Sequence, residues 1–137
     1  MNLTELIIGS VLAVMLSSTA VVFSDNSDAI NRGRAGMLCS DIRYVKNCAV
    51  SGRSGYKLRF FNDKDGYGYK IRDFNSTKKT VYFPKGIKSR YRKSEIEFRE
   101  SGSCPDAGTV YIEGPGDINR TITITPPTGR ILLKEEK

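Results

Sequence analysis

The feature that most constrains this chain is a continuous apolar segment close to its N-terminus. Residues 6 to 23 read LIIGSVLAVMLSSTAVVF, 18 positions without a charge. As a helix with a rise of about 1.5 Å per residue the segment is about 27 Å long, close to the hydrocarbon thickness of a bilayer. A cleaved secretory signal needs positive charge ahead of its apolar part, whereas the charged side chain ahead of this one is Glu5. We therefore predict a transmembrane helix within residues 1 to 27.

Helical periodicity continues beyond the apolar segment. One apolar face is formed by residues at i, i+4, i+7 and i+11, namely Leu38, Ile42, Val45 and Ala49. Gly33 lies in a polar stretch and can bend a helix, but no proline interrupts this part of the chain. We expect an amphipathic helix over residues 28 to 51, continuous with the apolar one, at the start of a globular domain of residues 28 to 137.

After Gly55 the pattern changes from helical to alternating. Residues 56 to 60 and 67 to 71 alternate around a turn rich in Asn, Asp and Gly, which predicts a β-hairpin. Further strands are expected at 79 to 83, 95 to 99, 109 to 113, 121 to 125 and 130 to 133. The predicted fold class is α+β, with a long helix first and an antiparallel β region over residues 55 to 134.

The composition argues against several kinds of chemistry. The chain has 22 Lys and Arg against 15 Asp and Glu, a net charge of +7, which raises non-specific affinity for anionic polymers and also serves solubility. It has no histidine and no C-x-x-C pair, which disfavours a transition-metal site and a histidine-based catalytic triad. We therefore expect no enzymatic activity, no cofactor and no metal.

Three cysteines suit one disulfide and one free thiol if the domain is exported. Cys39 and Cys48 lie nine positions apart on the expected helix, about 13 Å along its axis, too far to pair with each other. A bond from Cys104 to Cys48 or to Cys39 remains open, and so does the alternative of three reduced cysteines that pack as small hydrophobes.

The N-terminus resembles that of a known family. Residues 1 to 8, MNLTELII, are similar to the start of a mature type IV pilin, in which a glutamate follows four residues and precedes an apolar helix. The resemblance implies that a prepilin peptidase has removed a leader, that Met1 is N-methylated, and that Glu5 neutralises the N-terminal amine of a neighbouring subunit during assembly. The chain departs from the common major-pilin pattern at Val22, where a proline is usual.

Three segments of the remaining chain resemble one branch of this family, the GspH/FimT-type minor pilins and pseudopilins. They are residues 38 to 50, residues 82 to 87 with their Pro-x-Gly, and residues 108 to 112 followed by 121 to 130, which end in Thr-Gly-Arg. The resemblance implies a pilin fold whose apolar helical half spans the membrane while the second half packs on the sheet. It also implies a structural subunit, stored in the bacterial inner membrane and polymerised with other pilin subunits into an extracytoplasmic type IV pilus or type II secretion pseudopilus.

An alternative function is DNA binding by a minor pilin during DNA uptake. The densest basic segment contains Lys88, Arg90, Arg92 and Lys93, and Arg130 follows the Thr-Gly turn. These cations could contact duplex phosphates, but a solvated loop and edge strand would have the same composition. Cations gathered on one exposed face would favour DNA binding, and scattered cations would favour a purely structural subunit.

Overall fold

A single long helix begins the structure. The computed structural model describes residues 2 to 53, 55 to 115 and 119 to 136, without the side chains of residues 13 to 27 and 136. Helix α1 (Leu3–Val50) has 48 residues and passes through Gly33 without interruption. It starts at Asn2, whose side-chain oxygen accepts the backbone N–H of Leu3 at 3.1 Å, and ends at Ser51. Gly33 does not end the helix, in agreement with the absence of a proline that would remove a backbone donor there.

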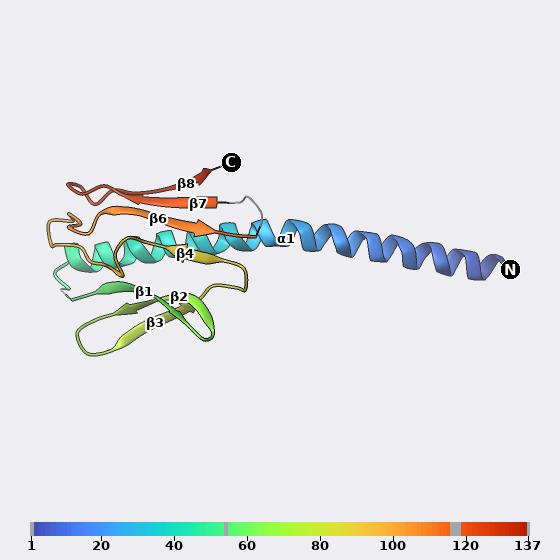
Figure 1. Ribbon diagram of the computed structural model, residues 1–137, viewed down its shortest axis with the longest axis horizontal. Helices are drawn as coiled ribbons and strands as arrows, with labels where there is room; N and C mark the ends of the chain where they lie inside the picture. Colours follow the sequence, from blue (N-terminus) through green and yellow to red (C-terminus); the bar gives the residue numbers. More distant parts are fainter. Residues whose placement is uncertain (1, 54, 116–118, 137) are drawn as a thin grey trace.

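The first half of α1 extends away from the rest of the molecule (Figure 1). We call residues 3 to 27 the stem and the part from Asp28 onwards the head. Most of the predicted transmembrane segment, residues 13 to 23, lies outside the part whose side chains are described. Among the residues that the structure does describe, no helix is both long enough and apolar enough to cross a membrane.

The head contains two antiparallel sheets, not one. Their strands are β1 (Lys57–Asp63), β2 (Gly66–Arg72), β3 (Thr77–Tyr82), β4 (Lys88–Arg90), β5 (Glu95–Ile96), β6 (Gly108–Glu113), β7 (Asn119–Ile124) and β8 (Ile131–Glu136). The first sheet has the order β3-β2-β1-β5 and the second β4-β6-β7-β8. Strands β6, β7 and β8 run roughly along the axis of α1, β2 and β3 run obliquely to it, and the two sheets lie on either side of its second half (Figure 1).

The core lies between α1 and the two sheets. Strands β1, β7 and β8 all contact α1. The apolar face predicted for the helix is buried, with Leu38, Ile42 and Val45 fully inaccessible to solvent. From the sheets, the buried side chains that meet this face include Leu58, Tyr69, Ile71, Val110 and Ile122. Burial of each such aliphatic side chain contributes about 1.5–3 kcal/mol, so this contact fixes the head on the helix.

The predicted α+β fold class is confirmed, and two details differ. The strand expected at 95 to 99 is only two residues long, with Glu95 paired to Arg59 and Ile96 paired to Leu58 of β1. The three cysteines are buried free thiols, and no disulfide joins Cys104 to Cys48 or Cys39 in the structure. The Cys104 thiol instead lies 3.4 Å from the carbonyl oxygen of Glu97.

Candidate assembly site

The described part of the stem presents apolar side chains on most of its circumference. Leu6, Ile7, Ile8, Val11 and Leu12 are each 51–58% exposed. Successive helical residues differ by about 100° around the axis, so these five residues cover far more than one stripe. A helix that is apolar nearly all round normally lies inside a protein or a membrane. The stem therefore requires a partner that covers it.

Glu5 is the acidic side chain of the first turn of α1. Its backbone N–H donates to the carbonyl oxygen of Asn2 at 3.0 Å, and its side chain is exposed. A carboxylate is favoured at a helix N-terminus because the helix dipole is positive there. Met1, the residue proposed to carry the methylated amine, lies outside the described residues.

The apolar surface of α1 continues into the head along its outward side. Ile30, Met37 and Tyr44 are 46%, 38% and 44% exposed and are spaced seven residues apart. This spacing keeps them on one line along the helix. A Cβ added at Gly33 would meet no other atom within 4 Å, so the backbone beside this line is open to close approach by another helix.

A buried arginine fixes the junction between stem and head. Arg120 is 2% exposed, and its guanidinium donates to Asp28 of α1 at 2.7 Å and to Glu135 of β8 at 3.1 Å. The hydrogen bond from Arg120 lowers the pKa of Asp28 below its usual value, against a smaller opposing effect of desolvation. These ion pairs tie the neighbouring strands β7 and β8 to α1 at the point where the stem meets the head.

A second polar contact fixes α1 on the first sheet. The hydroxyl of buried Tyr69 donates to the carboxylate of Asp41 at 2.6 Å, and Lys79 lies 3.0 Å from the same carboxylate. Burial and the neighbouring carboxylate raise the pKa of Tyr69. Because Tyr69 and Asp41 are both buried, each of these two groups depends on the other for its hydrogen bond, while Lys79 is partly exposed to solvent.

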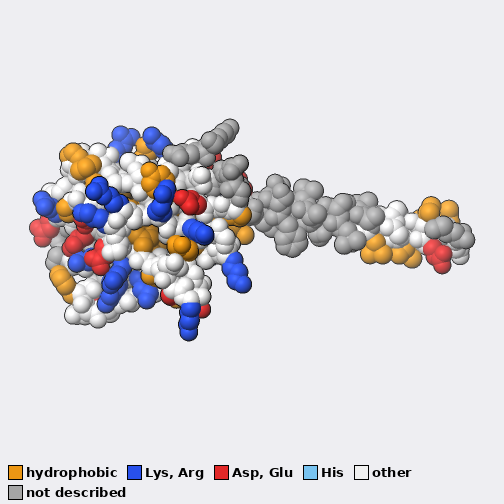
Figure 2. Space-filling model, in the orientation of Figure 1, with side chains coloured by type: hydrophobic (Ala, Val, Ile, Leu, Met, Phe, Trp, Pro, Cys, Tyr) orange, Lys and Arg blue, Asp and Glu red, His pale blue; other side chains and the backbone are white. Residues whose placement is uncertain are grey.

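The structure separates the residues of the predicted DNA site. Lys88 and Arg90 lie on edge strand β4, and Arg92 and Lys93 follow it, whereas Arg130 precedes β8 on the far side of β6 and β7. Two of the cations have partners: Arg90 lies 3.5 Å from Glu113 and over the ring of Tyr111, and Lys93 lies 2.6 Å from Asp106. Figure 2 shows Lys and Arg side chains spread over the visible face of the head, interspersed with acidic ones.

The turn that carries Arg130 has a structural role. Gly129 has a φ of 62°, and a Cβ at this position would collide with the carbonyl oxygen of Gly102. Lys46 of α1 donates to the carbonyl oxygens of Thr128 and Gly129 at 3.1 and 3.2 Å. The Thr-Gly-Arg sequence therefore closes the second sheet against the helix, as its turn chemistry suggests.

Sequence reasoning did not identify the two polar anchors of α1 or its outward apolar line. Arg120 occupies an inward position of β7, alternating with Ile122 and Ile124, which is the signal that could have marked it as buried. The seven-residue spacing of Ile30, Met37 and Tyr44 could also have been found. In the part of the chain that the structure describes, no group of three His, Cys, Asp or Glu side chains is placed to hold a metal ion.

Comparison with known proteins identifies the fold. The sequence matches no model of a known protein family, and no curated protein matches it. Two crystal forms of FimU, a type IV minor pilin of Pseudomonas aeruginosa, are similar in structure, with a TM-score of 0.59 and 23% sequence identity over 77% of this chain. The match covers 97% and 92% of the two FimU chains. The chain therefore has the fold of a type IV minor pilin.

Proposed function

We propose that the chain is a structural subunit of a type IV pilus or a related pseudopilus, and not an enzyme. It would be held in the bacterial inner membrane before assembly and would polymerise with other pilin subunits through the stem of α1. The observation that carries this proposal is the exposed apolar stem on a folded head. Before assembly a bilayer would cover this apolar surface, and after assembly the stems of neighbouring subunits would cover it, so it would be shielded from water in both states.

Glu5 would act during polymerisation. In a bundle of apolar stems its carboxylate needs a positive partner, because an unpaired charge in such surroundings is costly. The N-terminal amine of a neighbouring subunit, exposed by a prepilin peptidase and methylated at Met1, is the partner that the resemblance to type IV pilins implies. A minor subunit, present at few positions in the filament, fits the similarity to FimU.

The test compares Glu5→Gln with Glu113→Gln in cells that assemble the filament. Glu5→Gln keeps the size of the side chain and removes its charge, while Glu113 is a carboxylate of the head. We expect Glu5→Gln to leave the protein in the membrane fraction and to remove it from sheared filaments, whereas Glu113→Gln assembles normally. Equal incorporation of both variants would contradict the assembly role of Glu5.

A second candidate function is DNA binding by the same subunit. It is favoured by a hollow of about 390 Å³ on the second sheet, lined by Arg90, Tyr91, Arg92 and Tyr111 among others. No ion pair is formed by Lys88 or Arg92 within the described residues. Cations beside aromatic rings suit a nucleic-acid backbone with stacked bases.

Gel-shift titration of the full chain in detergent at increasing salt tests this candidate. Binding that weakens steeply with salt and is lost when Lys88, Arg90, Arg92 and Lys93 are all changed to Ala would support it. Arg130→Ala provides a separate arm, because Arg130 lies two strands away from the hollow. Absence of binding at low salt would leave the structural function alone.

A further inference from the structure

The β2–β3 loop, which contains Phe74, lies at the end of the head away from the stem (Figure 1). Phe74 is 75% exposed. Its loop is held by Asp73, whose carboxylate accepts the backbone N–H groups of Asn75 and Ser76 at 2.8 and 2.7 Å. These bonds lower the pKa of Asp73 to about 2. The ring therefore projects from a fixed turn.

Gly55 sets the position of this ring. The glycine has a φ of 91°, and a Cβ added there would collide with the ring atoms of Phe74. The edge of the ring thus lies directly against the backbone of the α1–β1 connection, while most of its surface faces solvent. A large apolar side chain that is fixed in place and still exposed is a typical anchor of a protein interface, because little conformational entropy is lost when it is buried.

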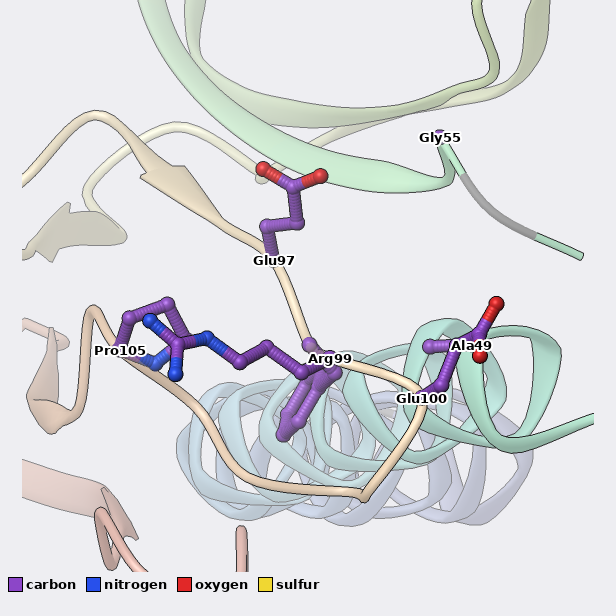
Figure 3. A pocket seen from close by; sticks show the side chains of 7 residues that line it. Ala49, Gly55, Glu97, Arg99, Glu100 and Pro105 are labelled. Carbon is purple, nitrogen blue, oxygen red and sulfur yellow. The ribbon is translucent and has the colours of Figure 1, made fainter. Parts of the chain in front are cut away.

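Gly55 also borders a cavity. It has a volume of about 400 Å³, and its lining includes the apolar groups of Ala49, Phe98 and Pro105. Figure 3 shows Glu97, Arg99 and Glu100 around an open space that Gly55 borders from the opposite side. The cavity is large enough to accept a phenyl ring, and its lining is mostly apolar with carboxylates at the border.

The charges around the ring and around the cavity differ in net sign. A cleft beside Phe74 is lined by the cations Lys57, Arg59 and Arg72 together with Asp73 and Glu95. The cavity is bordered by Glu97 and Glu100 together with Arg99. Lys57 already lies 3.6 Å from Glu97, but neither Arg72 nor Glu100 forms an ion pair within the described residues. An arginine beside the projecting ring and a glutamate beside the cavity are therefore both available to a partner.

We propose that two copies of the chain associate through this surface, with Phe74 of each copy inserted into the cavity of the other. Gly55 lines both the cleft at Phe74 and the cavity, so a two-fold axis close to Gly55 places each ring opposite the partner's cavity. Arg72 of one copy then faces Glu100 of the other. The contact lies in the head and is independent of the stem, so it does not rest on the proposed filament function.

Sedimentation of the full chain in detergent micelles gives the first test. We expect Phe74→Ala to weaken self-association at least about tenfold, since truncation of a central aromatic anchor has effects of that order. Leu132→Ala is the matched control, because Leu132 is an exposed apolar side chain on β8, remote from Gly55. Equal association of Phe74→Ala and the unsubstituted chain overturns the proposal.

A charge exchange tests the orientation of the two copies. Arg72→Glu and Glu100→Arg should each weaken association, and the double variant should restore it. Failure of the double variant to recover, with the head still folded by circular dichroism, excludes the proposed pairing of Arg72 with Glu100.

Photo-cross-linking identifies the contact directly. A benzophenone amino acid in place of Phe74, in a mixture of isotopically light and heavy chains, should produce mixed cross-links to residues 97 to 105. Mixed light–heavy cross-links that form only to residues outside the cavity overturn the proposal, whereas cross-links to Gly55 within one chain are expected. Association that depends on Leu6 and Ile7 but not on Phe74 also overturns it, while it leaves the proposed function of the stem intact.

Discussion

The two halves of α1 belong to one continuous helix, but the rest of the chain covers only the half that lies in the head. In the head half, Leu38, Ile42 and Val45 are fully buried under two sheets. In the stem, Ile7, Ile8 and their neighbours are more than half exposed. The same kinds of side chain therefore stabilise the fold in one half and cannot do so in the other.

This difference shows that helix formation and helix burial are separate requirements here. The stem is helical because its residues are good or tolerable helix formers, because Asn2 caps it, and because a packed helix continues from it without a break. Its apolar surface gains nothing from the head. Under the proposed function, the free energy of covering that surface would be gained on contact with a bilayer or with other subunits.

The comparison is tested most strongly by equal truncations in the two halves. Ile42→Ala should lower the free energy of unfolding of the head by about 2–5 kcal/mol, because it leaves a cavity in the core. Ile8→Ala should change it by less than about 0.5 kcal/mol, because Ile8 contacts no part of the head. Chemical unfolding in detergent, followed by near-ultraviolet circular dichroism of the tyrosines, measures both. Similar losses in the two variants would mean that the stem contributes to the stability of the head.

The anchor of α1 on the first sheet should give the next largest effect. Asp41→Ala leaves the buried hydroxyl of Tyr69 without its acceptor, at a cost of about 2–3 kcal/mol. Asp65→Ala, in the exposed β1–β2 turn, is the control and should be nearly neutral. The double variant Tyr69→Phe with Asp41→Ala lacks the unpaired hydroxyl and should be more stable than Asp41→Ala alone. If its free energy of unfolding is no higher, the unpaired hydroxyl is not the cause of the destabilisation.

The junction between the halves should respond more weakly. Arg120→Ala should lower the unfolding free energy by about 1–2 kcal/mol, since the partly exposed carboxylates of Asp28 and Glu135 can regain water. Hydrogen exchange of the α1 amides around Asp28 should accelerate, while exchange around Ile42 should change only with global stability. Uniform acceleration along α1 would argue against a local role.

Acid provides an independent check on Arg120. The folded-state pKa of Asp28 is lowered, so this group stabilises the fold above its usual pKa and the contribution is lost as the pH falls below about 4. The unsubstituted chain should therefore lose more stability between neutral pH and pH 3 than Arg120→Ala does. Parallel pH profiles would mean that the ion pair contributes nothing.

The smallest effect is expected at Gly33. The position is exposed in the middle of α1, and an added Cβ would meet no atom within 4 Å. Gly33→Ala should raise helix stability by about 0.5–1 kcal/mol through the lower entropy of the unfolded chain. If the outward face of α1 receives another helix, the same change should reduce filament incorporation despite the more stable head. Unchanged incorporation would exclude a close helix contact at Gly33.

The features of this structure that could be predicted from the sequence are those with a local sequence pattern. The β1–β2 hairpin follows from alternation around an Asp- and Gly-rich turn, and the buried face of α1 follows from the spacing of Leu38, Ile42 and Val45. Both signals lie within a few residues of the feature that they predict. The fold class could be predicted for that reason.

Contacts between distant residues could not be predicted in this way. Arg120 and Asp28 are 92 positions apart, and neither residue carries a local signal of the other. The division into two sheets depends on β4 and β5 pairing with different partners, β6 and β1, which strand-forming tendency does not determine. The basic residues from Lys88 to Lys93 formed one cluster in the sequence, but their acidic partners come from β6 and from the segment that precedes it.

The continuity of α1 determines how the molecule would carry mechanical load. A pull on the stem would enter the head along one helix, whose axis runs roughly along β6, β7 and β8 (Figure 1). The helix would have to slide past both sheets at once, so Leu38, Ile42 and Val45 would resist together in shear. Separation by peeling would break these contacts one at a time and would need less force. A head attached along the side of a tensile element can therefore stay folded while the tension bypasses its sheets.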